Sequence, residues 1–391
     1  MIVADFRIFN LIAIMIRFLT LHNFKCFNDM ELSLKNLTLV TGKNAAGKST
    51  VLQSLLLLKQ SYELRYLQDS QLCFSDRVVL ADLESYASVY SHDPDEGDPS
   101  FWIRIEDEKQ TEWTFQVAGQ EEQGAIVSFQ PEYKGDLADC SLFSDSMVYL
   151  HAERVSPRKR HIHKTKRNRL ESRLGDIHGD GAATLFYDSI DEPLVIPAMA
   201  HPEGGPDIAS QINAWMNDIM GQHVILSADA DPASIILKYG LMDRSGVEVE
   251  VSPMNMAFGN SYVFPIVAAI LTAPAGSLIL LENPEAHLHP AAQVAMGRFL
   301  SLAAANGIQL LVETHSDHLL NGVRLAVCSR EELDGPRLNP DLVNAYYFYE
   351  DKQQVFRHQY CEIEINEDGR LTDWPDGFFD TWEKALIRLN S

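Results

Sequence analysis

The stretch GKNAAGKST, residues 42–50, decides the fold of this chain. Its spacing is G-x-x-x-x-G-K-[ST]; the strand-like run LTLV precedes it, and an amphipathic helix pattern over 49–64 follows it. In such a loop the glycines free backbone N–H groups to wrap phosphates, the lysine reaches the β- and γ-phosphates, and the serine hydroxyl binds Mg²⁺. The loop therefore predicts an α/β fold with a nucleotide site formed by Gly42, Lys43, Asn44, Ala45, Ala46, Gly47, Lys48, Ser49 and Thr50, with Ser49 as a metal ligand.

A second stretch, LILLENPEAHLHP at 278–290, has the pattern of a buried strand that ends in carboxylates. A phosphate loop needs an acid at the end of a neighbouring strand to hold Mg²⁺ through water. Glu282 fits that position, although it lies 234 residues after Lys48. The next residue, where a general base is usual, is Asn283, whose amide cannot take a proton from water. The spacing predicts a large insertion between two halves of one site.

A third strand pattern, IQLLVE at 308–313, runs into THSD. A lone histidine is usually structural, but His315 follows a strand end next to the other two motifs. Ligands of open α/β sheets bind at such strand ends. We therefore expect His315 to reach the γ-phosphate.

The remaining pattern divides the chain into parts. Short strands fill 16–41, alternating strands over about 77–135 indicate an antiparallel β section, and helices alternate with strands from 261 onwards, which is typical of a parallel sheet. No long heptad run is present, so no long coiled coil is expected. We expect a first half of the nucleotide fold at 16–150, an inserted lobe with a basic segment and a β-hairpin at 151–250, and a second half with a small extension at 251–391.

Together the loop, the ENPEAHLHP strand end and the ETHSD strand end resemble the ATP-binding-cassette (ABC) ATPases of the structural-maintenance (SMC) and RecF/OLD type. The similarity is greatest to bacterial ATPases of the AAA_15/AAA_21 kind, many of them encoded beside nucleases in anti-phage defence loci. The ending DWPDGFFDTW, at 373–382, resembles one branch of these. The resemblance covers most of the chain and implies an ABC-type ATPase head that uses ATP and Mg²⁺.

The resemblance also implies a signature loop that contacts the nucleotide of a second subunit. Its place is AFGNSYVFPI, residues 257–266, where Gly259 fits the loop and Ser261 the helix N-cap. Tyr262 stands where the family usually has glutamine, and an ordinary helix start is the alternative. If the motif holds, two chains pack head-to-tail around ATP as a homodimer or a higher homo-oligomer.

In the family, Asn283 takes the position of the catalytic base, where related OLD-type sequences usually carry an acid. Three interpretations stay open: Glu285 serves as base, Asn283 positions water without deprotonating it, or the site binds ATP and hydrolyses almost nothing. Phosphoryl transfer depends mostly on positioning and electrostatics, so loss of a base slows the reaction without abolishing it. We favour slow hydrolysis assisted by Glu285, with the catalytic set Glu282, Asn283, Glu285 and His315. His287 and His289 fit a subunit-contacting loop better than a metal site.

The net charge of −23 excludes a generally basic nucleic-acid coat, but the segment Glu153–Arg173 carries nine Lys or Arg against two Glu, a net +7. It fits a solvated loop, a phosphate-backbone contact to DNA or RNA, or docking to an acidic face. The family resemblance adds that Arg154 and Arg158 face the nucleotide. The residues predicted to contact nucleic acid or a partner are Arg158, Lys159, Arg160, Lys164, Lys166, Arg167 and Arg169.

Five cysteines without a C-x-x-C pair favour a reducing, cytoplasmic setting. The apolar run at 8–16 is too short to span a bilayer, so no membrane role is expected, and either Met1 or Met15 is the start. Only about 60 residues follow the ETHSDHLLNGVRLAV stretch, too few for the metal-dependent nuclease domain of OLD proteins.

Three functions are compatible with these features. The first is a slow ATPase that oligomerises on ATP and regulates or scaffolds a separate effector, a nuclease or a toxin, in anti-phage defence. The second is a RecF-like ATPase that clamps DNA. The third is a non-hydrolysing, ATP-dependent scaffold that sequesters a toxin.

Overall fold

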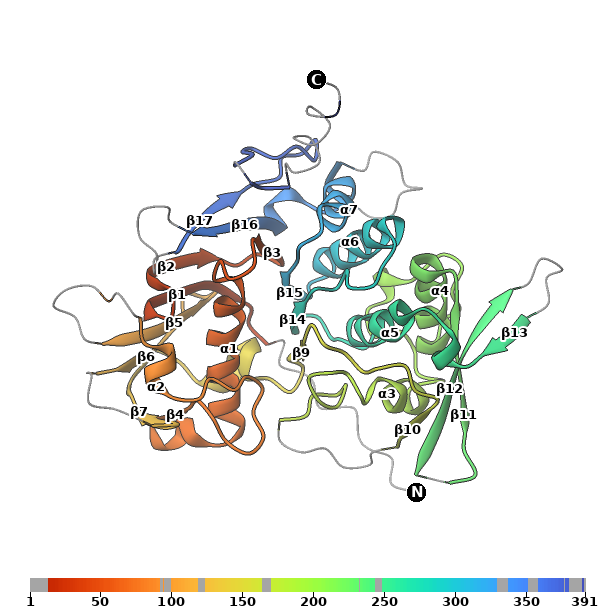
Figure 1. The fold of residues 1–391 in the computed structure, drawn as a ribbon, viewed down its shortest axis with the longest axis horizontal. Coiled ribbons are helices and arrows are strands. Elements are labelled where there is room, and N and C mark those ends of the chain that lie inside the picture. Colours follow the sequence, from red (N-terminus) through yellow and green to blue (C-terminus); the bar gives the residue numbers. More distant parts are fainter. Residues whose placement is uncertain are drawn as a thin grey trace.

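A computed structural model of the 391-residue chain describes residues 13–91, 94, 100–118, 124–163, 170–231, 233–242, 248–328, 337–350, 358–375, 377–379 and 389 (Figure 1). No helix among these residues is long and apolar enough to cross a membrane.

A six-stranded sheet forms the centre of the molecule, in the order β17-β16-β3-β15-β14-β9. All neighbouring strands are parallel except β16 and β17. The strands are β3 (Leu37–Gly42), β9 (Val148–Leu150), β14 (Leu278–Glu282), β15 (Gln309–Glu313), β16 (Val343–Glu350) and β17 (His358–Ile363). The inner strands are short, almost wholly buried apolar runs, as expected of a parallel sheet covered on both faces. The predicted parallel α/β half is confirmed.

Alternate residues of the central sheet enter two different cores. Val40, Leu280 and Leu311 pack with helix α1 (Lys48–Glu63), whereas their chain neighbours, among them Leu39 and Leu281, pack with the helices of the opposite face. This separation follows from the two-residue period of a strand. The helices on the opposite face are α5 (Phe258–Leu271), α6 (Pro290–Ala305) and α7 (Asp317–Cys328).

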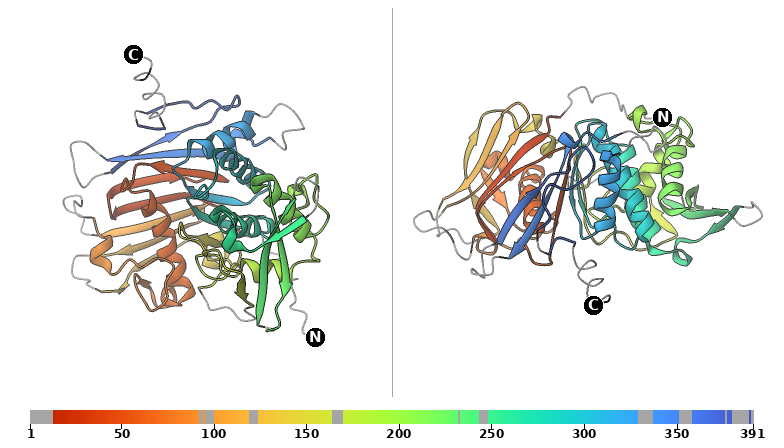
Figure 2. Two further views of the ribbon diagram at one scale, coloured as in Figure 1. Left: turned by 45° about the vertical axis from the view of Figure 1, so that its right-hand side comes forward. Right: turned by 90° about the horizontal axis from the view of Figure 1, so that it is seen from above.

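A five-stranded antiparallel sheet, β2-β1-β5-β6-β8, covers α1 from the other side (Figure 2). On β5 buried and half-exposed residues alternate, because one face of this sheet packs on α1. The antiparallel section predicted from sequence is confirmed. Its strands are β1 (Ile16–Phe24), β2 (Phe27–Ser33), β5 (Phe101–Asp107), β6 (Glu112–Val117) and β8 (Gln130–Tyr133); beside it lie the pair β4 (Gln71–Cys73) and β7 (Ile126–Ser128) and the short helix α2 (Tyr86–Val89).

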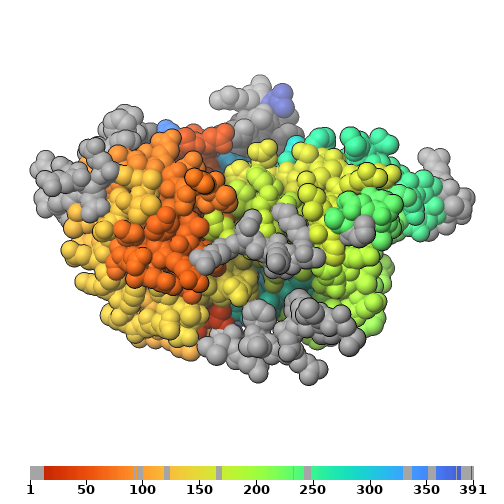
Figure 3. Space-filling model, turned by 90° about the horizontal axis from the view of Figure 1, so that it is seen from below, coloured from red at the N-terminus to blue at the C-terminus, as the bar shows by residue number. Residues whose placement is uncertain are grey.

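The middle of the chain forms a lobe at the end of the molecule opposite the antiparallel sheet (Figure 3). It consists of a sheet in the order β10-β12-β11, with β13 paired to β12, and of two helices. These elements are β10 (Arg160–Ile162), α3 (Ala182–Asp188), α4 (Ile208–Met220), β11 (His223–Ala228), β12 (Ser234–Met242) and β13 (Glu248–Val251). The β12–β13 hairpin was predicted. Helix α4 contacts α5 and α6, so the lobe shares its core with the helical face.

Helices α6 and α7 cross at two glycines. A Cβ on Gly297 would lie 2.2 Å from the carbonyl oxygen of Leu319, and a Cβ on Gly322 would lie 2.2 Å from that of Val294. The absence of side chains at both positions lets the backbones touch. This contact sets the position of the segment that joins β15 to α7, where His315 lies.

Candidate functional site

The loop between β3 and α1 has a backbone that requires glycine at two positions. Gly42 has φ 144° and Gly47 has φ 93°. A Cβ on Gly42 would lie 2.2 Å from the carbonyl oxygen of Phe348, and a Cβ on Gly47 would lie 2.7 Å from Sγ of Cys26. Any side chain would therefore both strain the loop and collide with its neighbours. Helix α1 begins directly after Gly47, so its N-terminus adjoins the loop.

A pocket of about 490 Å³ opens beside this loop, within the usual size range of ligand sites. The predicted residues that line it are Asn44, Ala45, Gly47, Lys48, Ser49, Thr50 and His315. The other lining residues were not predicted from the sequence; they are Lys25, Cys26, Gln53, Ser88, Glu313 and His358. They come from the β1–β2 turn, α1, α2 and the ends of β15 and β17, which only the fold brings together.

Glu313 is the acidic residue among the described residues that line this pocket. It ends β15, which lies directly beside the loop strand β3. The Ser49 hydroxyl donates to both carboxylate oxygens of Glu313, at 3.0 and 3.2 Å. Lys48 Nζ lies 3.9 Å from the same carboxylate and donates to the Lys43 carbonyl at 2.7 Å. Burial raises the pKa of Glu313 to about 7, although the Lys48 charge opposes this shift.

Glu282 lies one strand further from the loop, at the end of β14, and does not line the pocket. Its two carboxylate oxygens accept hydrogen bonds from the Tyr149 hydroxyl at 2.7 Å and from the Ala152 backbone N–H at 3.2 Å. His151 Nε2 lies 3.6 Å from the same carboxylate. Glu282 is adjacent to Glu313 in the register of the two strands.

Asn283, Glu285 and His315 are linked across the ends of β14 and β15. Asn283 has φ 44°, a left-handed conformation that asparagine tolerates, and its N–H donates to the Glu313 carbonyl at 2.8 Å. Its side-chain Oδ1 is buried and accepts no hydrogen bond from the described residues. Glu285 Oε1 accepts from the His315 N–H at 2.7 Å. Burial raises the pKa of Glu285, and burial together with the Lys48 charge lowers the pKa of the His315 ring.

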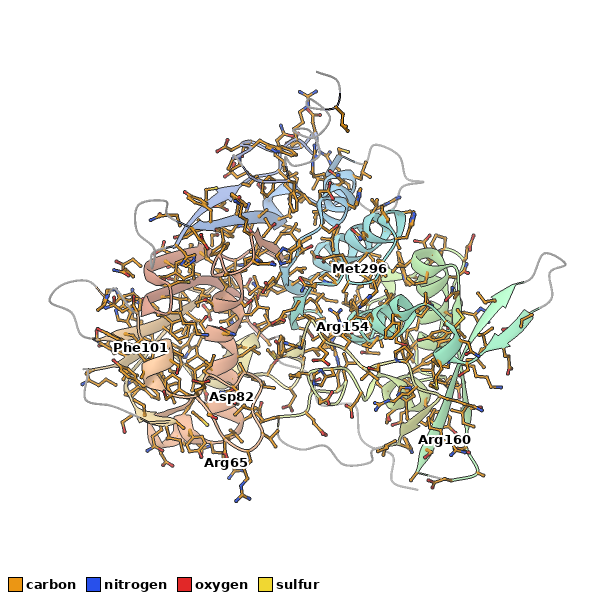
Figure 4. The ribbon with its side chains drawn as sticks, viewed as in Figure 1. Arg65, Asp82, Phe101, Arg154, Arg160 and Met296 are labelled. Carbon is orange, nitrogen blue, oxygen red and sulfur yellow. The ribbon has the colours of Figure 1, made fainter. Side chains whose placement is uncertain are left out.

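Arg154 fixes the backbone of this strand end. It is only 2 % exposed, and its guanidinium donates to the carbonyls of Glu282 at 2.5 Å and Asn283 at 3.3 Å. Its guanidinium carbon also lies 5.6 Å from the ring centroid of Tyr262. Burial lowers the pKa of Arg154 to about 10, and the charge of Glu285 is the largest opposing influence. Arg154 therefore joins the acidic strand end to α5 and does not line the pocket; Figure 4 labels it near α5.

The signature-like segment begins α5, but the prediction that Ser261 caps this helix is wrong. Helix α5 starts at Phe258, and its N-cap is Ala257. The reason is that both the backbone N–H and the side-chain amide of Asn260 donate to the Ala257 carbonyl, at 3.2 and 3.3 Å, which closes the first turn earlier. Gly259 is buried, and a Cβ on it would lie 2.9 Å from the His287 carbonyl. Neither Gly259 nor Ser261 lines the pocket of its own chain.

The two histidines of the H-x-H pair have separate contacts. The His287 ring packs against the rings of Phe258 and Tyr262, with centroids 5.7 and 4.8 Å apart. His289 is the N-cap of α6, and its Nδ1 accepts from the Ala291 N–H at 3.3 Å. The loop after β14 thus contacts the start of α5.

Three consecutive residues of the basic segment, at 158–160, carry positive charges on the surface of the lobe. Arg158, Lys159 and Arg160 are exposed. Arg160, which is labelled in the lobe in Figure 4, pairs with Asp229 at 2.8 Å. None of the three lines the pocket, so Arg158 does not join the phosphate loop in this structure. The predicted residues Lys164, Lys166, Arg167 and Arg169 lie outside the described residues.

Three family models match separate parts of the chain. Residues 15–164 match AAA_15, described as an AAA ATPase domain. Residues 226–321 match AAA_21, described as an AAA domain, putative AbiEii toxin, type IV TA system. Residues 338–389 match DUF3696, described as a protein of unknown function. No curated protein matches the chain.

Solved structures similar to this chain include SMC heads. The SMC head bound to the C-winged helix domain of ScpA has a TM-score of 0.50 at 11 % identity, covering 90 % of this chain and 98 % of that one. The SMC head domain with an extended coiled coil bound to the C-terminal domain of ScpA, from Pyrococcus furiosus, has a TM-score of 0.49 at 12 % identity, covering 96 % and 99 %. The SMC head domain from Thermotoga maritima has a TM-score of 0.44 at 10 % identity, covering 90 % and 100 %. The phosphate-loop geometry and the matches to two ATPase domain models support a P-loop ATPase, and the similarity to the first of these structures shows that the chain has the fold of an SMC head.

Proposed function

We propose that this chain binds ATP with Mg²⁺, hydrolyses it slowly, and uses the cycle to regulate or scaffold a separate effector. The observation that supports this most strongly is the pocket in which Lys48 and Ser49 meet the end of β15. The residues fit the ligands: glycines leave room at the loop, Lys48 supplies a buried cation for phosphates, and the hard oxygen donors of Ser49 and, through water, Glu282 suit Mg²⁺. When bound, the metal neutralises charge that develops on the phosphates.

Hydrolysis in this proposal depends on positioned groups rather than on a strong base. Asn283 orients water through its unpartnered Oδ1, and Glu285 takes up the proton. A raised pKa makes the Glu285 carboxylate a better proton acceptor near neutral pH than an ordinary glutamate. His315, whose backbone N–H binds Glu285, carries its ring into the pocket beside Lys48.

Glu285→Gln is expected to lower ATP turnover by about 100-fold, the lower range of what a general base contributes, while ATP affinity is kept. The amide retains the shape of the side chain and an oxygen for the His315 N–H but accepts no proton. Phosphate release at saturating ATP is the measurement. Glu132→Gln, an exposed carboxylate on β8, is the matched control. An unchanged rate in Glu285→Gln would remove this residue from the mechanism.

The start of α5 supports an ATP-dependent homodimer. Phe258 is 53 % exposed and Met254, just before the helix, is 72 % exposed. No α5 residue, all of them described, lines the pocket of the same chain, so this surface is free to contact the nucleotide of a second copy. Light scattering should show the mass doubling when ATP and Mg²⁺ are added, and Phe258→Asp should stay monomeric while it still binds ATP. A mass independent of ATP would contradict the dimer.

A nuclease or toxin in anti-phage defence is the proposed effector, and the cytoplasm is the proposed location. The description of the matched AAA_21 model names a putative toxin of a type IV toxin–antitoxin system, which supports a pairing of this kind. Co-expression with the product of the adjacent gene tests it: the two should co-purify, and ATP should change the amount recovered. The third function inferred from sequence, a non-hydrolysing scaffold, would show the same capture without phosphate release.

A RecF-like contact with DNA is the second candidate, because Arg158, Lys159 and Arg160 are exposed together on the lobe. Such a contact predicts binding of duplex DNA that weakens steeply with salt. Replacing all three by glutamine should then reduce the slope of log affinity against log salt by about 2–3. Equal binding by the triple variant and the wild type would exclude this surface.

A further inference from the structure

Two glutamates end neighbouring strands at the nucleotide site, and their surroundings differ. Glu313 on β15 is paired in register with Val40 of the loop strand, whereas Glu282 on β14 is separated from that strand by the whole width of β15. Glu313 lines the pocket and Glu282 does not. The strand order thus places Glu313, and not Glu282, next to the loop.

The Ser49–Glu313 pair has the separation of two adjacent metal ligands. The Ser49 oxygen lies 3.0 and 3.2 Å from the two carboxylate oxygens. Ligands at right angles around Mg²⁺, each at 2.0–2.1 Å, are separated by about 2.9 Å. Two oxygens at this distance could both bind one Mg²⁺ ion.

The partners of the Glu282 carboxylate, in contrast, do not line the pocket. The Tyr149 hydroxyl and the Ala152 N–H donate to one carboxylate oxygen each. The backbone of Glu282 is also fixed, since Arg154 donates to its carbonyl. To ligate a metal directly, Glu282 would have to lose these bonds and cross the width of a strand.

We propose that Glu313 is the carboxylate of this chain that ligates Mg²⁺ directly, beside Ser49, and that Glu282 acts only through water from behind it. This rests on the proposed function, because the metal enters with the nucleotide. One consequence concerns selectivity. Without a cation, the Glu313 carboxylate repels the phosphates; with a cation it attracts them through the metal. Glu313 thus makes the site prefer Mg·ATP over free ATP.

Calorimetric binding of a non-hydrolysable ATP analogue, in Mg²⁺ or in EDTA, tests the assignment. Wild type should bind more tightly in Mg²⁺. Glu313→Gln should lose most of that Mg²⁺ effect and should bind the metal-free analogue more tightly than wild type does. The surface control Glu132→Gln should keep the full effect, and Glu282→Gln should lose less of it than Glu313→Gln. Retention of the full Mg²⁺ effect by Glu313→Gln, or its loss in Glu282→Gln alone, would overturn the proposal. Wild type that binds neither form would instead refute the proposed function.

A second variant and a direct measurement of metal binding distinguish the loss of a metal ligand from the loss of a negative charge. Glu313→Asp keeps the negative charge but withdraws it by about 1.5 Å. It should weaken Mg²⁺-dependent binding without improving metal-free binding. Electron paramagnetic resonance of Mn²⁺, titrated with the analogue present, should show an affinity about 10–100-fold lower in both Glu313 variants. Equal Mn²⁺ affinity in wild type and both variants would overturn the proposal even if one variant were less stable.

Discussion

Lys48→Ala is expected to abolish measurable ATP turnover, with a fall of at least about 100–1,000-fold, the size seen when one preorganised stabilising group is removed from a transition state. Lys48 is 3 % exposed, and the phosphate loop holds its ammonium through the Lys43 carbonyl. Burial lowers the pKa of Lys48, while the Glu313 carboxylate opposes that shift, so the cation depends on its acidic neighbour. Among the described residues that line the pocket, Lys25 on the β1–β2 turn supplies the other Lys or Arg side chain.

Phosphate release with Mg²⁺, measured beside ATP binding on the same samples, checks this expectation. Lys109→Ala, an exposed lysine between β5 and β6, is the matched control and should behave as wild type. Turnover that survives in Lys48→Ala would show that the activity does not come from this loop. Tight binding by wild type without any turnover would support the non-hydrolysing scaffold.

Asn283→Asp is expected to raise turnover by about 100-fold, because it places a proton acceptor where the amide now stands and general bases contribute about 10²–10⁴. Aspartate has the same shape and also tolerates the left-handed backbone of residue 283, at φ 44°. The new carboxylate would lie next to Glu282 and near Glu285, and like charges raise the pKa of such a group. The gain should therefore be larger at pH 8 than at pH 6.

The double variant Asn283→Asp with Glu285→Gln shows which carboxylate accepts the proton. If the new carboxylate at position 283 takes over, the double variant should keep most of the gain, whereas the single Glu285→Gln loses activity. A double variant as slow as Glu285→Gln alone would mean that position 283 only orients water. ATP affinity should change little in either, because Asn283 does not line the pocket.

Patterns of neighbouring residues were enough to predict many local structures of this protein. The glycine spacing at 42–50, the apolar run of β14 and the alternation of β5 and β6 each depend on neighbours along the chain, and each forms as predicted. The wrong prediction that Ser261 caps α5 also has a local cause. The preference of serine for the N-cap position contributes only a small free energy, and the hydrogen bonds of Asn260 to Ala257 outweigh it. The division at 150 and 250 stays a prediction.

Which acidic residue contacts the loop depends on the order of the strands. Ser49 and Glu313 are separated by 264 residues, and nothing in the sequence near either one indicates the contact. The contact exists because β15 lies between β3 and β14. This strand order is set by the burial of whole strands against the helices on both faces of the sheet, and no sequence motif encodes it. The same holds for Arg154, which the family resemblance placed facing the nucleotide. It is buried instead, because two carbonyls and the Tyr262 ring replace the water around its charge. The nucleotide loop follows from the local sequence, whereas the order of the strands determines which side chains surround that loop.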